Sequence, residues 1–221
     1  VYQPAKVRDQ AFIQVLREMD ADVFVVIAFG QILPKDVLEL PRYGCVNIHA
    51  SLLPKYRGAA PIQWCVIDGE KETGITTMMM DVGLDTGAML AAVRTPQTEE
   101  GTCYAKMLTK SLGDIDWNQD ARSIERLIRG LNPWPSAYTM WNGRTIKIWA
   151  ADVLADGNPG DGLPCGGVAL SDRHCLAVRT GQGLLSIKEL QMEGKKRMDI
   201  ETFLRGYPIP AGDVFVNRTQ Q

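Results

Sequence analysis

Residues 22–29, DVFVVIAF, contain the longest unbroken apolar run in the chain, from Val23 to Phe29. The run is rich in β-branched residues and stops at Gly30, which is typical of a strand buried on both faces of a parallel sheet. Apolar residues at helical spacing precede it in residues 8–19. The fold is therefore expected to begin with a helix that leads into a central strand.

The same alternation continues along the first half of the chain. Further strands are predicted at residues 45–50, 75–82 and 88–94, and further helices at residues 34–40 and 61–69. Strands that alternate with helices predict a doubly wound α/β sheet.

The pattern changes after Arg94. Residues 95–120 are polar and weakly periodic and are interpreted as a linker, and residues 123–131 form a predicted helix that two prolines terminate. From Thr139 onward, short extended segments are separated by glycine-rich turns, which favours a small β-barrel. A last short helix is expected near residues 199–206, with Asp199 as its N-cap.

Composition excludes several classes of protein. The chain has 221 residues, 45% of them hydrophobic and 23% charged, with a net charge of -2, so we expect a soluble globular protein of one or two domains and no strongly basic nucleic-acid surface. Five cysteines without a C-x-x-C pair argue against disulfides and zinc, and two histidines are too few for a histidine-rich metal centre. We therefore predict a cytoplasmic monomer without metal and without membrane contact.

Neither G-x-G-x-x-G nor a P-loop motif is present, so dinucleotide and P-loop chemistry lack their usual support. Asn47 and His49 instead share one face of a predicted strand near its carboxyl end, where open α/β sheets bind ligands. Asp85 lies in the turn DVGLDTG at residues 81–87, from which a carboxylate could orient a histidine. The alternatives are a buried Asn and His that hold a loop, and an aspartate that caps its own turn.

Two long motifs carry a resemblance to a known family. Residues 47–63, NIHASLLPKYRGAAPIQ, and residues 80–87, MDVGLDTG, resemble the signatures of the 10-formyltetrahydrofolate-dependent formyltransferases. Three shorter segments agree: AFGQILP at 28–34, IDW at 115–117 and NPWP at 132–135. The resemblance covers nearly the whole chain. It implies a Rossmann-like α/β catalytic domain at residues 1–110, then a linker helix and an OB-like, tRNA-binding β-barrel at residues 111–221.

The resemblance also implies the chemistry. Asn47, His49 and Asp85 would be the catalytic residues, and the formyl group of 10-formyltetrahydrofolate would pass to the amino group of initiator methionyl-tRNA. An amide and an imidazole can stabilise the developing oxyanion, and Asp85 can position the imidazole. Which of the three residues accepts the amine proton stays open. The alternatives are a related enzyme that acts on an amino-sugar nucleotide or hydrolyses formyltetrahydrofolate, and a non-catalytic RNA-binding remnant, which has no need of these three residues.

Binding residues follow from the same resemblance. The folate would be bound by the loop after the second strand and by the segment after the first: Ser51, Leu52, Leu53, Pro54, Phe29, Gly30 and Ile32. Contacts with the folate tail or with tRNA phosphates are predicted for Lys55 and Arg57, and contacts with tRNA phosphates are predicted for the basic cluster Lys195, Lys196 and Arg197. The alternative for all five is an ordinary solvated loop or turn.

The chain departs from the family pattern at two places. The family's first strand and G-T-P-x-F-like turn have no counterpart before Val1, which suggests that the native N-terminus is not included. Residues expected between Glu99 and Cys103 are also missing. We expect a gap in the chain there, which a Cα separation well above about 3.8 Å would reveal; a continuous chain would mean a deletion.

Overall fold

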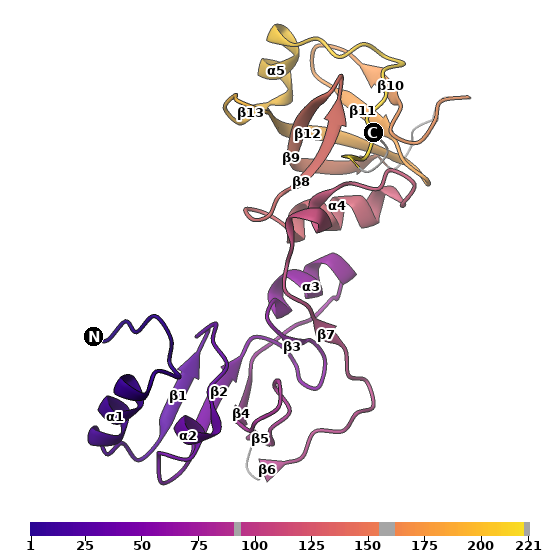
Figure 1. Ribbon diagram of the computed structural model, residues 1–221. Coiled ribbons are helices and arrows are strands. Elements are labelled where there is room, and N and C mark those ends of the chain that lie inside the picture. Colours follow the sequence, from indigo (N-terminus) through magenta and orange to yellow (C-terminus); the bar gives the residue numbers. More distant parts are fainter. Residues whose placement is uncertain (91–93, 155–161, 219–221) are drawn as a thin grey trace. The chain divides into compact units, whose positions relative to one another are not determined.

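The computed structural model describes residues 1–90, 94–154 and 162–218. The chain divides into two compact units (Figure 1). Unit 1 consists of residues 1–64 and 71–107, and unit 2 of residues 65–70 and 108–221. Within the described ranges, no helix has both the length and the apolar character needed to cross a membrane.

Unit 1 is built on a five-stranded sheet with the order β1-β2-β4-β5-β6. The strands are β1 (Phe24–Ile27), β2 (Cys45–His49), β4 (Thr76–Met79), β5 (Met89–Leu90) and β6 (Arg94–Thr95). The first three predicted strands are present. The prediction of a single strand at residues 88–94 is wrong, because Leu90 of β5 pairs with Arg94 of β6 in antiparallel register; residues 91–93 lie outside the described residues.

Only β1 and β2 are parallel, so the predicted parallel arrangement is wrong for the rest of the sheet. The register gives the reason. His49, at the end of β2, lies opposite Thr76, at the start of β4. The chain therefore re-enters the sheet at the same end of the strands at which it left. A parallel strand would require a crossover to the opposite end of the strands.

Unit 1 contains the helices α1 (Gln10–Glu18) and α2 (Lys35–Leu38) and the start of α3 (Pro61–Asp68), whose last residues, 65–68, belong to unit 2. Ile13 of α1 and Val37 of α2 form a core with one face of β1, against which Phe24 and Val26 pack. The other face of β1 is open, since Val25 is 60% and Ile27 61% exposed. The prediction of a strand buried on both faces is therefore wrong.

The loop that follows β2 holds a short strand, β3 (Arg57–Gly58), which pairs in parallel with β7 (Tyr104–Ala105). The chain reaches β7 through a turn in which the Thr102 amide donates to the Glu99 carbonyl at 3.2 Å.

Unit 2 is an antiparallel sheet with the order β10-β11-β12-β9-β8, and β13 also pairs with β12. Its elements are η1 (Lys110–Gly113), α4 (Ala121–Gly130), β8 (Ala137–Trp141), β9 (Arg144–Leu154), β10 (Val168–Ser171), β11 (Leu176–Arg179), β12 (Leu184–Met192), β13 (Met198–Asp199) and α5 (Ile200–Gly206). Asp199 caps α5 as predicted, because its carboxylate accepts from the Thr202 amide at 2.8 Å.

Part of the predicted linker belongs to the core of unit 2. Ile115 and Trp117 are almost fully buried, and the Trp117 indole donates to the Thr139 hydroxyl at 3.0 Å. Residues 95–120 look polar because these apolar residues are isolated rather than periodic. Their burial could not be inferred from the pattern.

The described strands of unit 2 do not form a closed barrel. A late segment instead bridges the two ends of the sheet: Val216 pairs with Met140 of β8, and Val214 pairs with Gly167, next to β10. Four backbone hydrogen bonds of 2.8 to 3.0 Å hold residues 213–216 in this position.

The N-terminus of α4 generates a stability prediction. The Asp120 carboxylate accepts from the Ser123 amide at 3.0 Å and from its hydroxyl at 2.7 Å. Asp120→Ala should lower the free energy of unfolding by about 1 kcal/mol, whereas Asp120→Asn, which keeps an acceptor, should lower it much less. Urea unfolding followed by tryptophan fluorescence measures both, and equal losses would contradict the capping role.

The same cap should depend on pH. Hydrogen bonds from the Ser123 hydroxyl and amide lower the pKa of Asp120. The ionised cap therefore stabilises the fold above the pKa that aspartate has in the unfolded chain, and the contribution is lost as pH falls through the folded pKa. The difference in unfolding free energy between wild type and Asp120→Ala should shrink in acid.

Candidate active site

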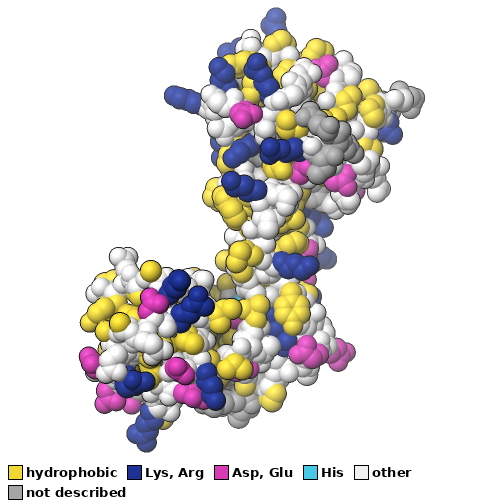
Figure 2. All heavy atoms as spheres, in the orientation of Figure 1, with side chains coloured by type: hydrophobic (Ala, Val, Ile, Leu, Met, Phe, Trp, Pro, Cys, Tyr) yellow, Lys and Arg dark blue, Asp and Glu magenta, His cyan; other side chains and the backbone are white. Residues whose placement is uncertain are grey.

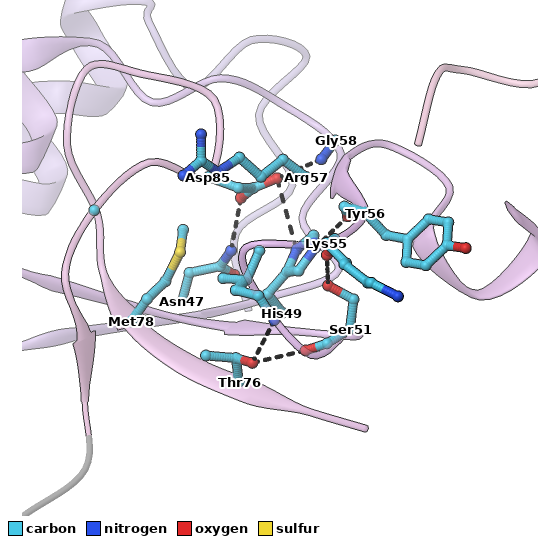
Figure 3. Close-up of polar contacts among 12 residues, drawn as sticks. Asn47, His49, Ser51, Lys55, Tyr56, Arg57, Gly58, Thr76, Met78 and Asp85 are labelled. Carbon is cyan, nitrogen blue, oxygen red and sulfur yellow. Dashed lines mark hydrogen bonds and ion pairs between the residues drawn. The ribbon is translucent and has the colours of Figure 1, made fainter. Parts of the chain in front are cut away.

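Three side chains predicted from the sequence meet at the end of β2 (Figure 3). The Asn47 side-chain amide donates to Asp85 Oδ1 at 3.2 Å. His49 Nδ1 lies 3.6 Å from Asp85 Oδ2. Asp85 is 38 residues from Asn47 in the sequence, so the sheet and the turn after β4 bring them together. The arrangement places an amide, an imidazole and a carboxylate at one point.

The second ring nitrogen of His49 indicates how the imidazole can act. His49 Nε2 lies 2.9 Å from the Tyr56 carbonyl oxygen, which can only accept a hydrogen bond. Nε2 therefore carries the hydrogen in the neutral ring, and the lone pair is on Nδ1, beside Asp85. A proton taken up at Nδ1 would form an imidazolium next to a carboxylate, while the ring stays 6% exposed.

Asp85 is held in an uncommon backbone conformation. Its φ is +54°, in the left-handed region that non-glycine residues rarely adopt. The Gly58 amide donates to its Oδ2 at 2.9 Å. Asp85 does not cap its own turn, because Asp81 does so: Asp81 Oδ1 accepts from the Gly83 amide at 3.0 Å and from the Thr86 hydroxyl at 2.7 Å. The Asp85 carboxylate is thereby left to face Asn47 and His49.

Glycine is required close to this turn. A Cβ on Gly87 would lie 1.8 Å from the Met79 carbonyl oxygen, which no side chain can tolerate. The turn therefore packs backbone against backbone on β4.

The loop at residues 51–56 is fixed by short polar contacts. The Ser51 hydroxyl donates to the Lys55 carbonyl at 2.7 Å. The Thr76 hydroxyl donates to the Ser51 carbonyl at 2.7 Å and accepts from the Leu53 amide at 3.1 Å. Sequence reasoning missed Thr76, because a single threonine in a strand carries no recognisable signal.

The residues predicted to bind folate divide by exposure. Phe29, Ile32 and Leu52 are 43%, 81% and 51% exposed, so their apolar side chains are accessible. Of the other four, Ser51 and Leu53 are buried and Pro54 is half-buried, whereas Gly30 is exposed and has a positive φ of 73°. β1 and β2 are parallel, so Phe29, which follows β1, lies at the same end of the sheet as His49, the last residue of β2.

The two basic residues of the loop, Lys55 and Arg57, also differ in their exposure to solvent. Lys55 is exposed, whereas Arg57 is only 1% exposed. The Arg57 guanidinium donates to Gln97 Oε1 at 2.9 Å and to Glu99 Oε1 at 3.1 Å. Burial works to lower the pKa of Arg57, but hydrogen bonds and charge interactions with Glu99 and Tyr104 outweigh it and raise the pKa. Arg57 therefore faces protein partners rather than a phosphate in solvent.

The remaining predicted basic residues, Lys195, Lys196 and Arg197, are exposed and lie in unit 2. In the described part of the chain, no group of three or more His, Cys, Asp or Glu residues is arranged to hold a metal ion.

Comparisons with known proteins place the chain in a family. The Formyl transferase family model matches residues 1–112, and the Formyl transferase, C-terminal domain model matches residues 107–208. A methionyl-tRNA formyltransferase of Agathobacter rectalis is 47% identical over 253 aligned positions, covering 97% of this chain and 81% of the relative. One from Lachnospira eligens is 45% identical, covering 96% and 80%. Because the alignment exceeds the 221 residues of this chain, it contains positions without a counterpart here.

Solved structures share the fold at low sequence identity. HypX from Aquifex aeolicus in complex with tetrahydrofolic acid gives a TM-score of 0.61 at 18% identity, covering 93% of this chain and 45% of that one. Methionyl-tRNA formyltransferase from Clostridium thermocellum gives 0.56 at 19% identity, covering 68% and 80%. With both family models matched and relatives identical at nearly half of the aligned positions, this chain belongs to the formyl transferase family.

Proposed function

We propose that this protein transfers the formyl group of 10-formyltetrahydrofolate to the amino group of initiator methionyl-tRNA. The observation that carries the proposal is that Asn47, His49 and Asp85 lie together at the carboxyl end of β2. The relatives of the chain are named methionyl-tRNA formyltransferases. Formyl transfer to an amine passes through a tetrahedral intermediate, so it needs a proton acceptor for the amine and donors for the developing oxyanion.

His49 is the proton acceptor in this proposal. Its Nε2–H is engaged by Tyr56, so the amine proton goes to Nδ1, and Asp85 stabilises the resulting positive charge. Asn47 uses one amide hydrogen on Asp85 and directs the other toward the oxyanion. The protonated His49 then returns the proton to the leaving folate nitrogen, which leaves the protein unchanged.

The donor would bind at the apolar edge next to this site. Phe29, Ile32 and Leu52 offer exposed apolar surface suited to a flat ring, and the Ser51–Thr76 contacts keep the intervening loop in place. We propose that these side chains, with the backbone of residues 30 and 51–54, form the folate site.

Unit 2 is proposed to bind the tRNA, as an OB-like domain. Lys147 Nζ and the Arg197 guanidinium lie 5.7 and 5.0 Å from the centre of the Trp149 ring, and Lys195 Nζ lies 5.8 Å from that of Tyr207. Aromatic rings flanked by basic side chains are typical of nucleic-acid surfaces. Lysine and arginine side chains reach the visible surface of this unit (Figure 2).

The proposal is tested by formyl transfer with the complete gene product. Charged initiator methionyl-tRNA is offered as the acceptor, and free methionine, glycinamide ribonucleotide and an amino-sugar nucleotide are offered in parallel. We expect turnover with the charged tRNA only. Turnover with an amino-sugar nucleotide, or donor hydrolysis without any acceptor, would assign the chain to another branch of the family.

The catalytic residues can be tested one at a time. Asn47→Ala, His49→Ala and Asp85→Ala should each lower kcat by about 100-fold or more, because each removes a group that acts on the reacting atoms. His174→Ala is the matched control, since His174 is the other histidine and is 74% exposed in unit 2. Circular dichroism checks that each variant is folded. Wild-type kcat in any of the three would remove that residue from the site.

The proposed tRNA-binding residues predict a different kinetic signature. Replacing both Lys195 and Lys196 by Ala should raise KM for the charged tRNA and leave KM for the folate unchanged. The dependence of log KM on log salt concentration should become shallower by about 1 for each tRNA phosphate that the variant no longer neutralises. Lys188→Ala is the control, because Lys188 already has Asp152 at 3.6 Å. An unchanged KM in the double variant would place tRNA elsewhere.

A further inference from the structure

The most deeply buried charged side chain in the described part of unit 1 lies next to the proposed active site. Arg57 is 1% exposed, and a buried guanidinium is costly unless its donors are paired. Three acceptors from one segment meet it: Gln97 Oε1 at 2.9 Å, Glu99 Oε1 at 3.1 Å and the Thr98 carbonyl at 3.4 Å. Arg57 therefore sets the position of residues 97–99.

Gln97 connects Arg57 to the turn that contains Asp85 by hydrogen bonds to both. Because its Oε1 accepts from Arg57, its amide nitrogen points away from the guanidinium. That nitrogen donates to the Asp85 carbonyl at 2.9 Å and to the Gly87 carbonyl at 2.8 Å. Both amide hydrogens are thus used on the backbone on either side of Thr86.

The Asp85 turn needs such support. A non-glycine residue at φ +54° is strained, and this conformation persists only where its surroundings enforce it. Gly58, which follows Arg57, also donates its amide to Asp85 Oδ2. Residues 57 and 58 therefore support Asp85 in two ways. Gly58 bonds the Asp85 carboxylate directly, and Arg57 acts on the Asp85 backbone through Gln97.

We propose that Arg57 and Gln97 are positioning residues for Asp85: Arg57 orients the Gln97 amide, and Gln97 holds the turn so that the Asp85 carboxylate faces Asn47 and His49. Neither residue touches the reacting atoms. The proposal gives Arg57 a role different from the phosphate contact predicted from sequence. It rests on the proposed function only for its kinetic test.

Gln97→Met tests the proposal, because it keeps the length of the side chain and removes both amide donors. The chain has two histidines, so their imidazole signals are easily distinguished by NMR. The His49 signal should shift, because the Asp85 carboxylate moves relative to the ring, while the His174 signal in unit 2 should stay in place. The kcat for formyl transfer should fall by about 10-fold or more, with KM for the folate within about twofold of wild type.

Gln97→Glu provides a second variant if Gln97→Met does not fold. It keeps an oxygen for Arg57 and removes both donors to the turn, so the same His49 shift and the same fall in kcat are expected. Glu100→Gln is the matched control, since Glu100 is an exposed residue of the same segment. It should change neither the signal nor kcat.

The outcomes separate this proposal from the function itself. An unshifted His49 signal in a folded Gln97 variant overturns the positioning role, whatever kcat does. A shifted signal with wild-type kcat shows that the turn moved without consequence and also overturns it. If the wild-type protein transfers no formyl group, the proposed function fails, yet the His49 signal still reports whether Gln97 holds Asp85.

Discussion

Everything in the candidate site depends on where one carboxylate points. Asp85 receives a hydrogen bond from Asn47 on β2 and another from the backbone of Gly58, and it lies beside His49. These partners come from the sheet and from the loop after it, so the carboxylate joins segments that would otherwise be independent. A negative charge that is partly buried needs such partners, and it orders them in return. The chemistry proposed for His49 follows from this one placement.

The surrounding backbone is arranged to keep that placement. Asp81 takes over the capping of the turn, the close approach at Gly87 presses the turn onto β4, and Tyr56 occupies the far nitrogen of His49. Each contact is modest by itself. Together they leave Nδ1 of His49 as the ring atom that faces the carboxylate, and Nδ1 is the atom at which proton uptake is proposed.

The sequence predicts which side chains come together better than it predicts the sheet that carries them. Asn47 and His49 could be placed on one face by the two-residue period of a strand, and the two long motifs joined Asp85 to them. The apolar run at Val23–Phe29 could not reveal that Val25 and Ile27 stay exposed. A hydrophobic pattern shows which side chains are apolar, but it does not show whether another element packs on that face of the strand. Gln97 and Thr76 also escaped prediction. Both side chains donate hydrogen bonds to backbone carbonyls of residues that are distant in the sequence. Every residue has a backbone carbonyl, so residue type cannot reveal such contacts.

The bridging segment at residues 213–216 has a consequence for the order of assembly. Protein chains are synthesised from the N-terminus, so β8 and the residues leading into β10 emerge long before the segment that joins them. In that interval both have unpaired backbone groups, which invite pairing with other nascent chains. Unit 2 therefore completes its hydrogen bonding only when residues 213–216 leave the ribosome, and a chain truncated before them would expose both edges permanently.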